Sequence, residues 1–201
     1  MPNYVTNRIR VRQSDWGTLL DALVNEDWEV DFTKVTPMPD SVYQGTLSGD
    51  DYTAPEGYTD TWYAWRKRKW GTKWNAKYTD IDHANHEVRF ETAWYHPFPV
   101  IYTLGEQTGI PLYVLYADED DGNNLGGYIL NKHRYWAEFP KEGSPEAVNL
   151  TSLIDSGESV KDSYGADEYT EIFEQHPALE ETYDPWERYG LNPPDKEQEQ
   201  A

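Results

Sequence analysis

Two stretches of this 201-residue chain repeat the same succession of patterns, and that repetition constrains the fold more than any single motif does. In each stretch, apolar residues first alternate as in a strand, then recur at spacings of three and four as in a helix, and then alternate again. A strand, a helix and a second strand in succession form a βαβ-like unit. The sequence therefore predicts a sheet protein with two such halves.

The first half covers about residues 3–35. Residues 3–12 alternate between apolar and polar side chains, which predicts a strand with one buried face and one face in water. Ser14 is a suitable N-cap for an amphipathic helix that ends near residues 25–27. Residues 28–35 alternate again, and Pro37 ends this second predicted strand because proline cannot donate to a sheet.

A long insertion, about residues 40–76, follows in the predicted order. Residues 40–59 are rich in Gly, Asp, Ser and Pro, which is typical of a loop. Asp60 is then expected to cap a helix that runs through Lys69, and Gly71 is expected to end it.

The second half begins with a predicted strand over residues 87–94. Pro97 and Pro99 open a helix that Gly109 closes, and residues 112–117 and 126–130 are predicted strands, while 132–139 could form one more. This order fits an α+β, ferredoxin-like split βαβ fold, an antiparallel sheet with helices on one face, and we assign it to residues 1–139.

Residues 140–201 form an acidic C-terminal extension. They hold 4 Lys/Arg and 16 Asp/Glu, a net charge of −12, whereas residues 1–139 hold 13 and 21, a net charge of −8. Short helices are expected near residues 164–175 and 184–190. Aromatic side chains among carboxylates make candidate anchors for a protein partner: Tyr164, Tyr169, Phe173, Tyr183, Trp186 and Tyr189.

The net charge of −20 disfavours direct nucleic-acid binding, with residues 66–69 (Arg-Lys-Arg-Lys) as the one local exception. Twenty charges match about 34 Å of duplex DNA, so the surface could instead imitate DNA. The chain has no cysteine, which excludes disulfides and thiolate chemistry. Without a signal-peptide pattern or an apolar run of membrane-spanning length, we expect a soluble, cytoplasmic protein.

An aromatic box at residues 70–74, Trp-Gly-Thr-Lys-Trp, is followed about twenty residues later by a strand-like run that ends in Trp94. One interpretation is a ligand pocket with stacking rings, oriented by a lysine and a glutamate. The other, which we favour, is that the rings hold the insertion on the sheet while Lys73 and Glu91 form an internal ion pair. The candidate pocket residues are Trp70, Thr72, Lys73, Trp74, Glu91, Thr92, Trp94 and His96.

Residues 80–86 contain Asp80, Asp82, His83 and His86, but their spacing lacks a third ligand set, so we interpret them as a polar loop and expect no metal. Residues 118–124 lack the spacing of a calcium loop and predict a turn. The chain has no glycine-rich nucleotide motif and no nucleophile motif. We therefore expect no cofactor, and the residues favour a non-enzymatic protein.

Five separated segments resemble the YubB ferredoxin-like domain family, whose members are carried by plasmids and phages: residues 1–7, 32–39, 70–74, 90–97 and 119–127. The resemblance covers about residues 1–130. It departs at Tyr4-Val5, where the family has Trp-Cys, at Lys69, where it has Asn, and at Tyr95-His96, where it has Ser-Pro. It implies a ferredoxin-like fold and a mobile-element setting, without a known reaction or an iron-sulfur cluster.

These observations lead to one main functional hypothesis. We expect an accessory protein of a phage or plasmid that binds a host or phage protein, for example as an acidic inhibitor of a host defence nuclease. The alternative is a nucleotide or small-ligand binding protein, or an enzyme, that uses the aromatic pocket. A third hypothesis is a structural or virion-associated protein. The sequence leaves the oligomeric state open.

Overall fold

The computed structural model describes residues 3–47, 53–119, 125–130, 135–136, 147, 151, 154 and 155. A short 3-10 turn, Gln13–Asp15, precedes the first helix. The elements follow in the order β1 (Tyr4–Arg10), α1 (Trp16–Leu23), α2 (Phe32–Val35), β2 (Val42–Tyr43), β3 (Asp60–Thr61), α3 (Trp62–Lys69), β4 (Lys77–Asp82), β5 (Glu87–Ala93), α4 (Phe98–Thr108), β6 (Leu112–Asp118), β7 (Gly126–Leu130) and β8 (Tyr135–Trp136).

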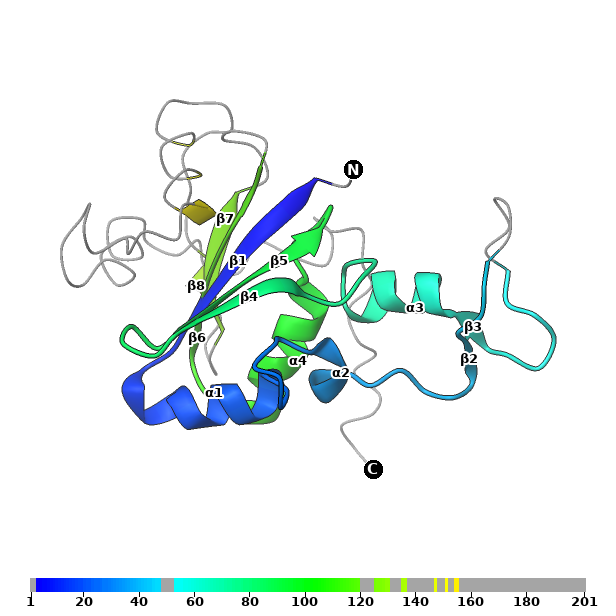
Figure 1. Cartoon of the computed structure of the whole chain (residues 1–201), viewed down its shortest axis with the longest axis horizontal. Coiled ribbons are helices and arrows are strands. Elements are labelled where there is room, and N and C mark those ends of the chain that lie inside the picture. Colours follow the sequence, from blue (N-terminus) through cyan, green and yellow to red (C-terminus); the bar gives the residue numbers. More distant parts are fainter. Residues whose placement is uncertain are drawn as a thin grey trace.

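The main sheet has the strand order β4-β5-β1-β6-β7-β8, with every neighbouring pair antiparallel. In a split βαβ arrangement, β1, β4, β5 and β6 are the first to fourth strands in the chain, and their order across the sheet is second, third, first, fourth. Strands β7 and β8 extend that sheet beyond β6. Helices α1, α2 and α4 lie on one face of it (Figure 1). The predicted ferredoxin-like fold is confirmed.

The second half of the fold matches its prediction closely. Strands β5, β6 and β7 lie within two residues of the predicted strands, and α4 ends at Gly109, which adopts a left-handed φ of +64°. Within residues 132–139, the described part forms β8. Strong local signals explain this agreement, since prolines at the start and glycine after the end mark a helix in the sequence itself.

The second strand of the first half was placed wrongly. Residues 28–35 do not form a sheet strand: Val30 makes only an isolated bridge to Val24, and Phe32–Val35 is the short helix α2. The Asp31 carboxylate accepts a hydrogen bond from the backbone N–H of Thr33 and caps that helix. A short apolar run fits both the two-residue period of a strand and the 3.6-residue period of a helix, and the Asp31 cap favours the helix.

The true second strand is β4, which begins just after the predicted insertion and ends within the predicted polar loop. It lies at the edge of the sheet and its side chains are exposed or half-buried, so it shows no buried alternation. Its partner β5 supplies the apolar face. The insertion therefore enters between α1 and β4, before the second sheet strand, rather than between the two halves.

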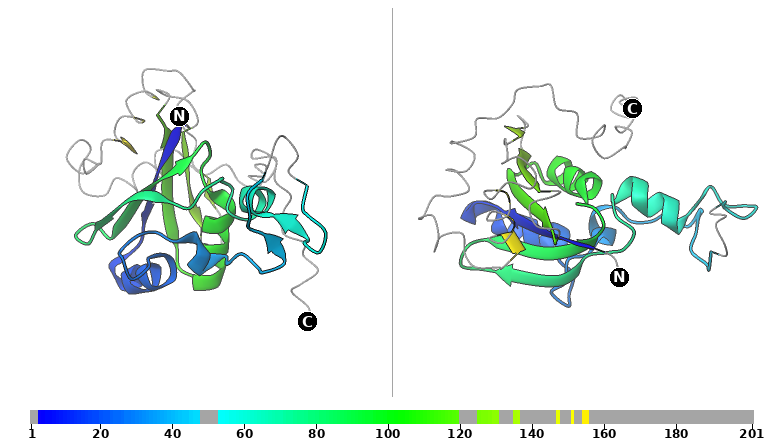
Figure 2. Two further views of the ribbon diagram at one scale, coloured as in Figure 1. Left: turned by 45° about the vertical axis from the view of Figure 1, so that its right-hand side comes forward. Right: turned by 90° about the horizontal axis from the view of Figure 1, so that it is seen from above.

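The insertion carries α3 on an arm that projects away from the sheet (Figures 1 and 2). Parallel strands β2 and β3 pair beyond α3, at the end of that helix that lies away from the sheet (Figure 1). The N-cap of α3 is Thr61, whose hydroxyl accepts from the Ala64 N–H at 3.3 Å, whereas Asp60 belongs to β3 and pairs with Arg68. The predicted cap was thus one residue early.

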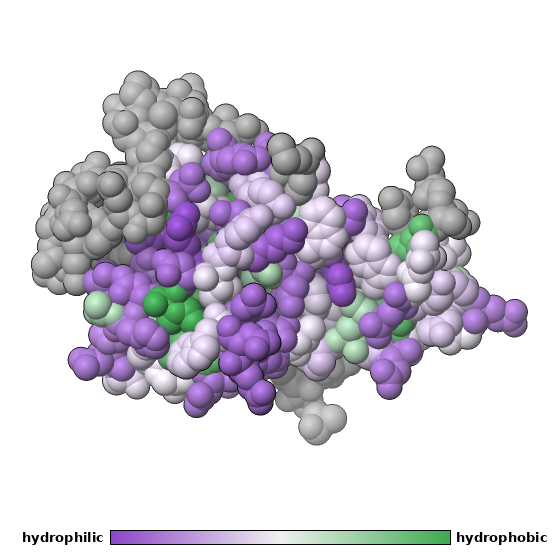
Figure 3. All heavy atoms as spheres, in the orientation of Figure 1, coloured by the Kyte–Doolittle hydropathy of each residue, from purple (hydrophilic) through white to green (hydrophobic). Residues whose placement is uncertain are grey.

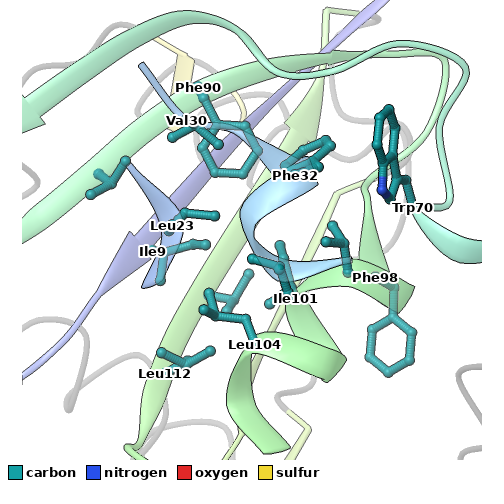
Figure 4. Packing of buried hydrophobic residues seen from close by; sticks show 14 of the residues in the cluster. Ile9, Leu23, Val30, Phe32, Trp70, Phe90, Phe98, Ile101, Leu104 and Leu112 are labelled. Atoms are coloured by element: carbon teal, nitrogen blue, oxygen red, sulfur yellow. The ribbon is translucent and has the colours of Figure 1, made fainter. Parts of the chain in front are cut away.

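The main core lies between the sheet and its helices. Phe32 of α2 packs edge to face against Phe90 of β5 and against Trp70, which closes the end of the core next to the arm (Figure 4). Ile101 and Leu104 of α4 fill the middle and are fully buried. Three large rings in contact anchor the end of the insertion to the sheet.

The other face of the sheet is also covered, which corrects the predicted water-facing side of β1. Thr6 and Arg8 are only 3% and 4% exposed. Arg8 pairs with the buried Glu87 at 2.6 Å, and Thr6 donates to the Asp155 carboxylate at 2.7 Å. A residue alternating with apolar neighbours can be buried when a later segment covers it and its charge is paired.

The covering segment comes from beyond residue 139. Ala147, Thr151, Ile154 and Asp155 have helical backbone, and Ala147 and Ile154 pack with aliphatic side chains of β6 and its flank in a second buried cluster. The packing of the domain therefore continues to Asp155. The aromatic anchors predicted at 164–189 lie outside the described residues.

Candidate functional site

The aromatic box begins where α3 ends. Gly71 follows with φ +84°, and a β-carbon there would lie 2.5 Å from the Pro99 ring, so both the backbone conformation and the space require glycine. The turn brings the box against the start of α4 and the end of β5.

Trp70 is a structural residue of the core. It is 1% exposed, its indole N–H donates to the Thr36 carbonyl at 2.9 Å, and its ring meets Trp65 and Phe32 edge to face. These contacts join the arm to the loop after α2. Trp70 is thus placed as a clamp of the insertion and does not line a described hollow.

Thr72 and Thr92 also serve the fold. The buried Thr72 hydroxyl donates to the Ala93 carbonyl at 2.8 Å, and the Thr92 hydroxyl donates to the Tyr95 carbonyl at 2.8 Å. Both bonds secure the chain where β5 turns toward α4. A hydroxyl whose proton is directed to a buried carbonyl orients the backbone rather than a ligand.

His96 is the centre of a buried polar network. The amide N–H₂ of Asn7 donates to Thr92, so the Asn7 carbonyl oxygen faces His96 Nδ1 at 2.6 Å and can only accept. His96 therefore carries its proton on Nδ1, and its Nε2 accepts from the Tyr128 hydroxyl at 2.5 Å. Burial raises the pKa of Tyr128 well above its ordinary value, which keeps it a donor. The imidazole also stacks on Tyr116.

Glu91 lies on the other side of the sheet from Thr92. It is the register partner of Thr6, and burial raises its pKa above the ordinary value, with Arg89 opposing and Asp155 adding to the shift. Ion pairs among the described residues include Arg8–Glu87, Arg12–Asp15 and Arg68–Asp60, and neither Lys73 nor Glu91 takes part in one of them. The predicted Lys73–Glu91 ion pair is therefore not formed, and the structure does not bring these two residues together in one pocket.

Lys73 and Trp74 lie in a different environment, where cations and rings alternate. The Lys73 ammonium stands 5.6 Å from the Tyr63 ring centroid and 4.8 Å from that of Trp74. Lys77 stands 5.2 Å from Trp74 and 5.8 Å from Tyr4. Contacts of this kind hold a cation over a ring face and leave its other donors available.

The series continues along α3. Arg66 lies over the rings of Trp62 and Trp70, at 5.2 and 4.8 Å, and Trp62 meets Tyr63 edge to face. We call this continuous set the cation–aromatic strip. Its members come from β1, α3, the segment between α3 and β4, and the first residue of β4: Tyr4, Trp62, Tyr63, Arg66, Lys73, Trp74 and Lys77.

Arg66 is the least satisfied member of the strip. Its Nε is buried without a hydrogen-bond partner, and among the described residues it forms no ion pair. Burial lowers its pKa from the ordinary arginine value, although guanidinium stays charged at neutral pH. A partly buried cation is costly unless an anion pairs with it, and none of the described carboxylates does so here.

Two adjoining hollows open along the strip. The larger, of 540 Å³, is lined by residues 44–47 together with Trp62, Tyr63, Arg66, Lys73 and Trp74. The smaller, of 240 Å³, is lined by Tyr63, Lys67, Lys73, Ala93, Trp94 and Tyr95. Tyr63 and Lys73 form the wall between them. Of the predicted pocket residues, Lys73, Trp74 and Trp94 line these hollows.

Residues 83–86 connect β4 to β5, so the predicted loop over residues 80–86 is wrong for residues 80–82, which end β4. Asp82 accepts from the backbone N–H groups of Ala84 and Asn85, which makes the turn, while His83 Nδ1 accepts from the Trp16 indole at 3.2 Å. Within the described ranges no group of three or more metal-ligating side chains gathers. Nor does any helix there have the length and apolarity to cross a membrane.

The fold and the site together define a small ferredoxin-like α+β domain with an inserted cation–aromatic arm. Residues 73–152 match a family model described as a ferredoxin-like domain in Api92-like protein. The match starts at the lysine of the aromatic box and runs through β8 to the segment that covers the second face of the sheet. Searches of curated proteins and of solved structures gave no match.

Sequence reasoning missed Tyr4, Trp62, Tyr63 and Lys77 of the strip, and it noted Arg66 only as part of the basic run at residues 66–69. The signal was present in the sequence. Residues 61–79 contain six Lys/Arg, four Trp and two Tyr but no Asp or Glu, in a chain whose net charge is −20. A net charge averaged over the whole chain conceals such a segment.

Proposed function

We propose that this chain is a binding protein for a planar, anionic ligand of the nucleotide class, held at the cation–aromatic strip. The observation that supports it best is the alternation of rings with Arg66, Lys73 and Lys77, none of which forms an ion pair with a described carboxylate. Rings stack on bases, and cations bind phosphate.

The surface around the arm fits a ligand of this class better than a fatty one. In the space-filling view, green aliphatic areas are small and separate, and the arm is mostly pale or purple (Figure 3). Aromatic side chains with a polar rim are typical of sites that bind planar polar molecules.

A titration with nucleoside monophosphates, followed by calorimetry, tests the proposal. Lys73→Ala and Arg66→Gln should each weaken binding by about tenfold, since a charge-assisted contact contributes about 1.5 to 3 kcal/mol. Lys69→Ala is the matched control, because it removes the same charge from an exposed position on α3. Equal losses from Lys69→Ala and Lys73→Ala, or no binding to the unaltered protein at millimolar nucleotide, would overturn the proposal.

We also propose that the chain acts in a phage or plasmid setting and binds a protein partner through its acidic extension. The support is the resemblance of residues 1–130 to the YubB family and the net charge of −12 over residues 140–201. Within the described part of this extension, Ala147 and Ile154 pack in a buried cluster of the domain. A basic, nucleic-acid-binding protein such as a host defence nuclease is the expected partner.

Full-length chain and a variant with the carboxylates between residues 158 and 187 changed to amides would be compared as bait in plasmid- or phage-bearing cells. A partner captured by the first and lost with the second supports the acidic interface, as would inhibition of that partner's nuclease activity. Equal capture by both chains contradicts it.

A further inference from the structure

We infer that the strip binds single-stranded nucleic acid, with successive bases in the two adjoining hollows and the phosphates on the cations between them. This inference rests on the proposed nucleotide-class function and names the form in which the nucleotides arrive.

The arrangement of the hollows is the first argument. Small-molecule sites usually enclose about 300 to 1,000 Å³. The larger hollow, at 540 Å³, lies within that range, and the smaller, at 240 Å³, adjoins it across Tyr63 and Lys73. A single compact ligand would occupy one hollow, whereas two hollows with a shared cationic wall suit a chain of repeated units.

The order of groups along the strip is the second argument. From α3 to the sheet, the contacts run from Tyr63 to Lys73, to Trp74, to Lys77 and to Tyr4. Rings thus alternate with ammonium groups at spacings of 4.8 to 5.8 Å. A single strand presents the same alternation of bases and phosphates, and proteins bind it without sequence preference by stacking and charge.

Two exposed rings held in an unfavourable backbone conformation lie beside the strip. Trp94 is 46% exposed with φ +71°, and Tyr78 is 70% exposed with φ +52°. Tyr78 meets Tyr4 edge to face, and Trp94 lines the smaller hollow. A bulky residue at positive φ costs about 1 to 3 kcal/mol, and such conformations concentrate at binding sites. Here the conformation presents large rings to solvent, where bases can stack.

The local charge is the third argument. Residues 61–79 hold six Lys/Arg and no Asp or Glu. Arg68 is paired with Asp60, and Glu91 is the cross-strand register partner of Lys77, the member of the strip that begins β4. Salt screens charges beyond about 8 to 10 Å, so the acidic remainder of the chain repels a bound strand less than its net charge suggests. A duplex offers no unstacked bases to the hollows and covers more of the acidic surface.

Fluorescence anisotropy with labelled oligonucleotides tests the inference on the full-length chain. The probes are dTMP and UMP as competitors, thymidine and uridine oligomers of two to twelve residues, and a twelve-base-pair duplex. We expect affinity to rise at least tenfold from the monophosphate to the longer oligomers, and single strands to bind at least tenfold more tightly than the duplex. The DNA and RNA series show which backbone is preferred.

Two sets of variants locate the binding. Trp74→Ala should weaken oligomer binding by about tenfold and Trp74→Phe should restore most of it, because stacking on an aromatic ring contributes about 1 to 3 kcal/mol per base. Lys73→Ala should lower the slope of log affinity against log salt by about 0.7, the value for one phosphate contact on a single strand. Trp28→Ala, at an exposed tryptophan away from the strip, is the control.

The outcomes separate this inference from the proposed function. If monophosphates and oligomers bind equally per site, or the duplex binds as well as the single strand, the strand inference is wrong and nucleotide binding stands. If nothing binds, both are wrong. If oligomers bind but Trp74 and Lys73 variants behave as Trp28→Ala does, the strand binds elsewhere and the inference is again overturned.

Discussion

Removing the Trp70 side chain should destabilise the fold more than any other change within the aromatic box. The indole is 1% exposed and contacts Phe32 and Trp65, and its N–H donates to Thr36. A buried tryptophan removes about 150 to 250 Å² from water, which at about 25 cal/mol per Å² corresponds to roughly 4 to 6 kcal/mol. Measured losses for Phe or Trp changed to Ala in cores are about 3 to 5 kcal/mol.

We therefore expect Trp70→Ala to lower the free energy of unfolding by about 4 kcal/mol, a large part of the roughly 5 to 15 kcal/mol typical of a domain. The midpoint of thermal unfolding should fall by about 8 to 16 °C, at 2 to 4 °C per kcal/mol for a chain of this size. Trp70→Phe keeps a ring but loses the indole hydrogen bond, and should cost about 1 to 2 kcal/mol.

Urea denaturation followed by far-ultraviolet circular dichroism measures these changes, because nine tryptophans make fluorescence hard to assign. Trp28→Ala, at a ring that is 59% exposed, is the control and should cost less than about 1 kcal/mol. A loss below about 1.5 kcal/mol for Trp70→Ala, or a loss equal to that of Trp28→Ala, would refute the clamp role and imply that the arm is held in another way.

Three further changes test other parts of the structure by the same denaturation assay. Glu87→Gln leaves the buried Arg8 without its carboxylate and should cost about 3 to 5 kcal/mol; a cost under 1 would show that water reaches the pair. Gly71→Ala should destabilise by more than 2 kcal/mol because of its positive φ and the adjacent proline ring, whereas Gly57→Ala, also at positive φ but in open space, should cost about 1; equal costs would contradict the steric argument. Burial raises the pKa of Asp31, but hydrogen bonds from a threonine and an asparagine lower it by more, so the pKa is lowered overall. The stabilising contribution of the Asp31 carboxylate is therefore present at pH 7 and lost as pH falls below about 4. The difference in unfolding free energy between the unaltered chain and Asp31→Asn should be smaller at pH 3 than at pH 7, and an unchanged difference would contradict this assignment.

The clamp and the strip divide the aromatic box between two roles. Trp70 and Thr72 turn inward and hold the arm, while Lys73 and Trp74 line the hollows. A substitution at Trp70 should thus weaken ligand binding through the fold, and one at Lys73 should weaken it with the unfolding free energy nearly unchanged. Measuring both quantities for both variants separates the two roles.

Predictable parts of the fold were those with strong local signals. The helix between Pro97 and Gly109 and the strands β5, β6 and β7 follow from proline and glycine placement and from period-two alternation, which depend only on neighbouring residues. The strand over residues 28–35 failed because a run of that length fits helix and strand alike, and the Asp31 cap selected the helix. Strand β4 was missed because an edge strand with exposed side chains has no buried face to mark it.

The candidate site was predicted only in part, for a related reason. Trp70, Thr72, Thr92 and His96 are polar or aromatic in sequence, and only the packing shows that their polar atoms are directed to buried partners. Glu91 and Thr92 are neighbours in sequence but lie on opposite faces of the sheet, since successive strand residues point in opposite directions. That alternation removes Glu91 from the pocket predicted for it.

The sequence by itself determined the ferredoxin-like order of strands and helices in the second half, the need for glycine after α3, and the local excess of positive charge over residues 61–79, because each depends on residues close in the chain. Only the tertiary structure decided which strand completes the first half, which face of the sheet is covered, and which members of the aromatic box face inward. Those outcomes depend on contacts between segments such as Thr6 and Asp155 or Trp70 and Thr36, and no local pattern encodes a pairing between residues that meet only on folding.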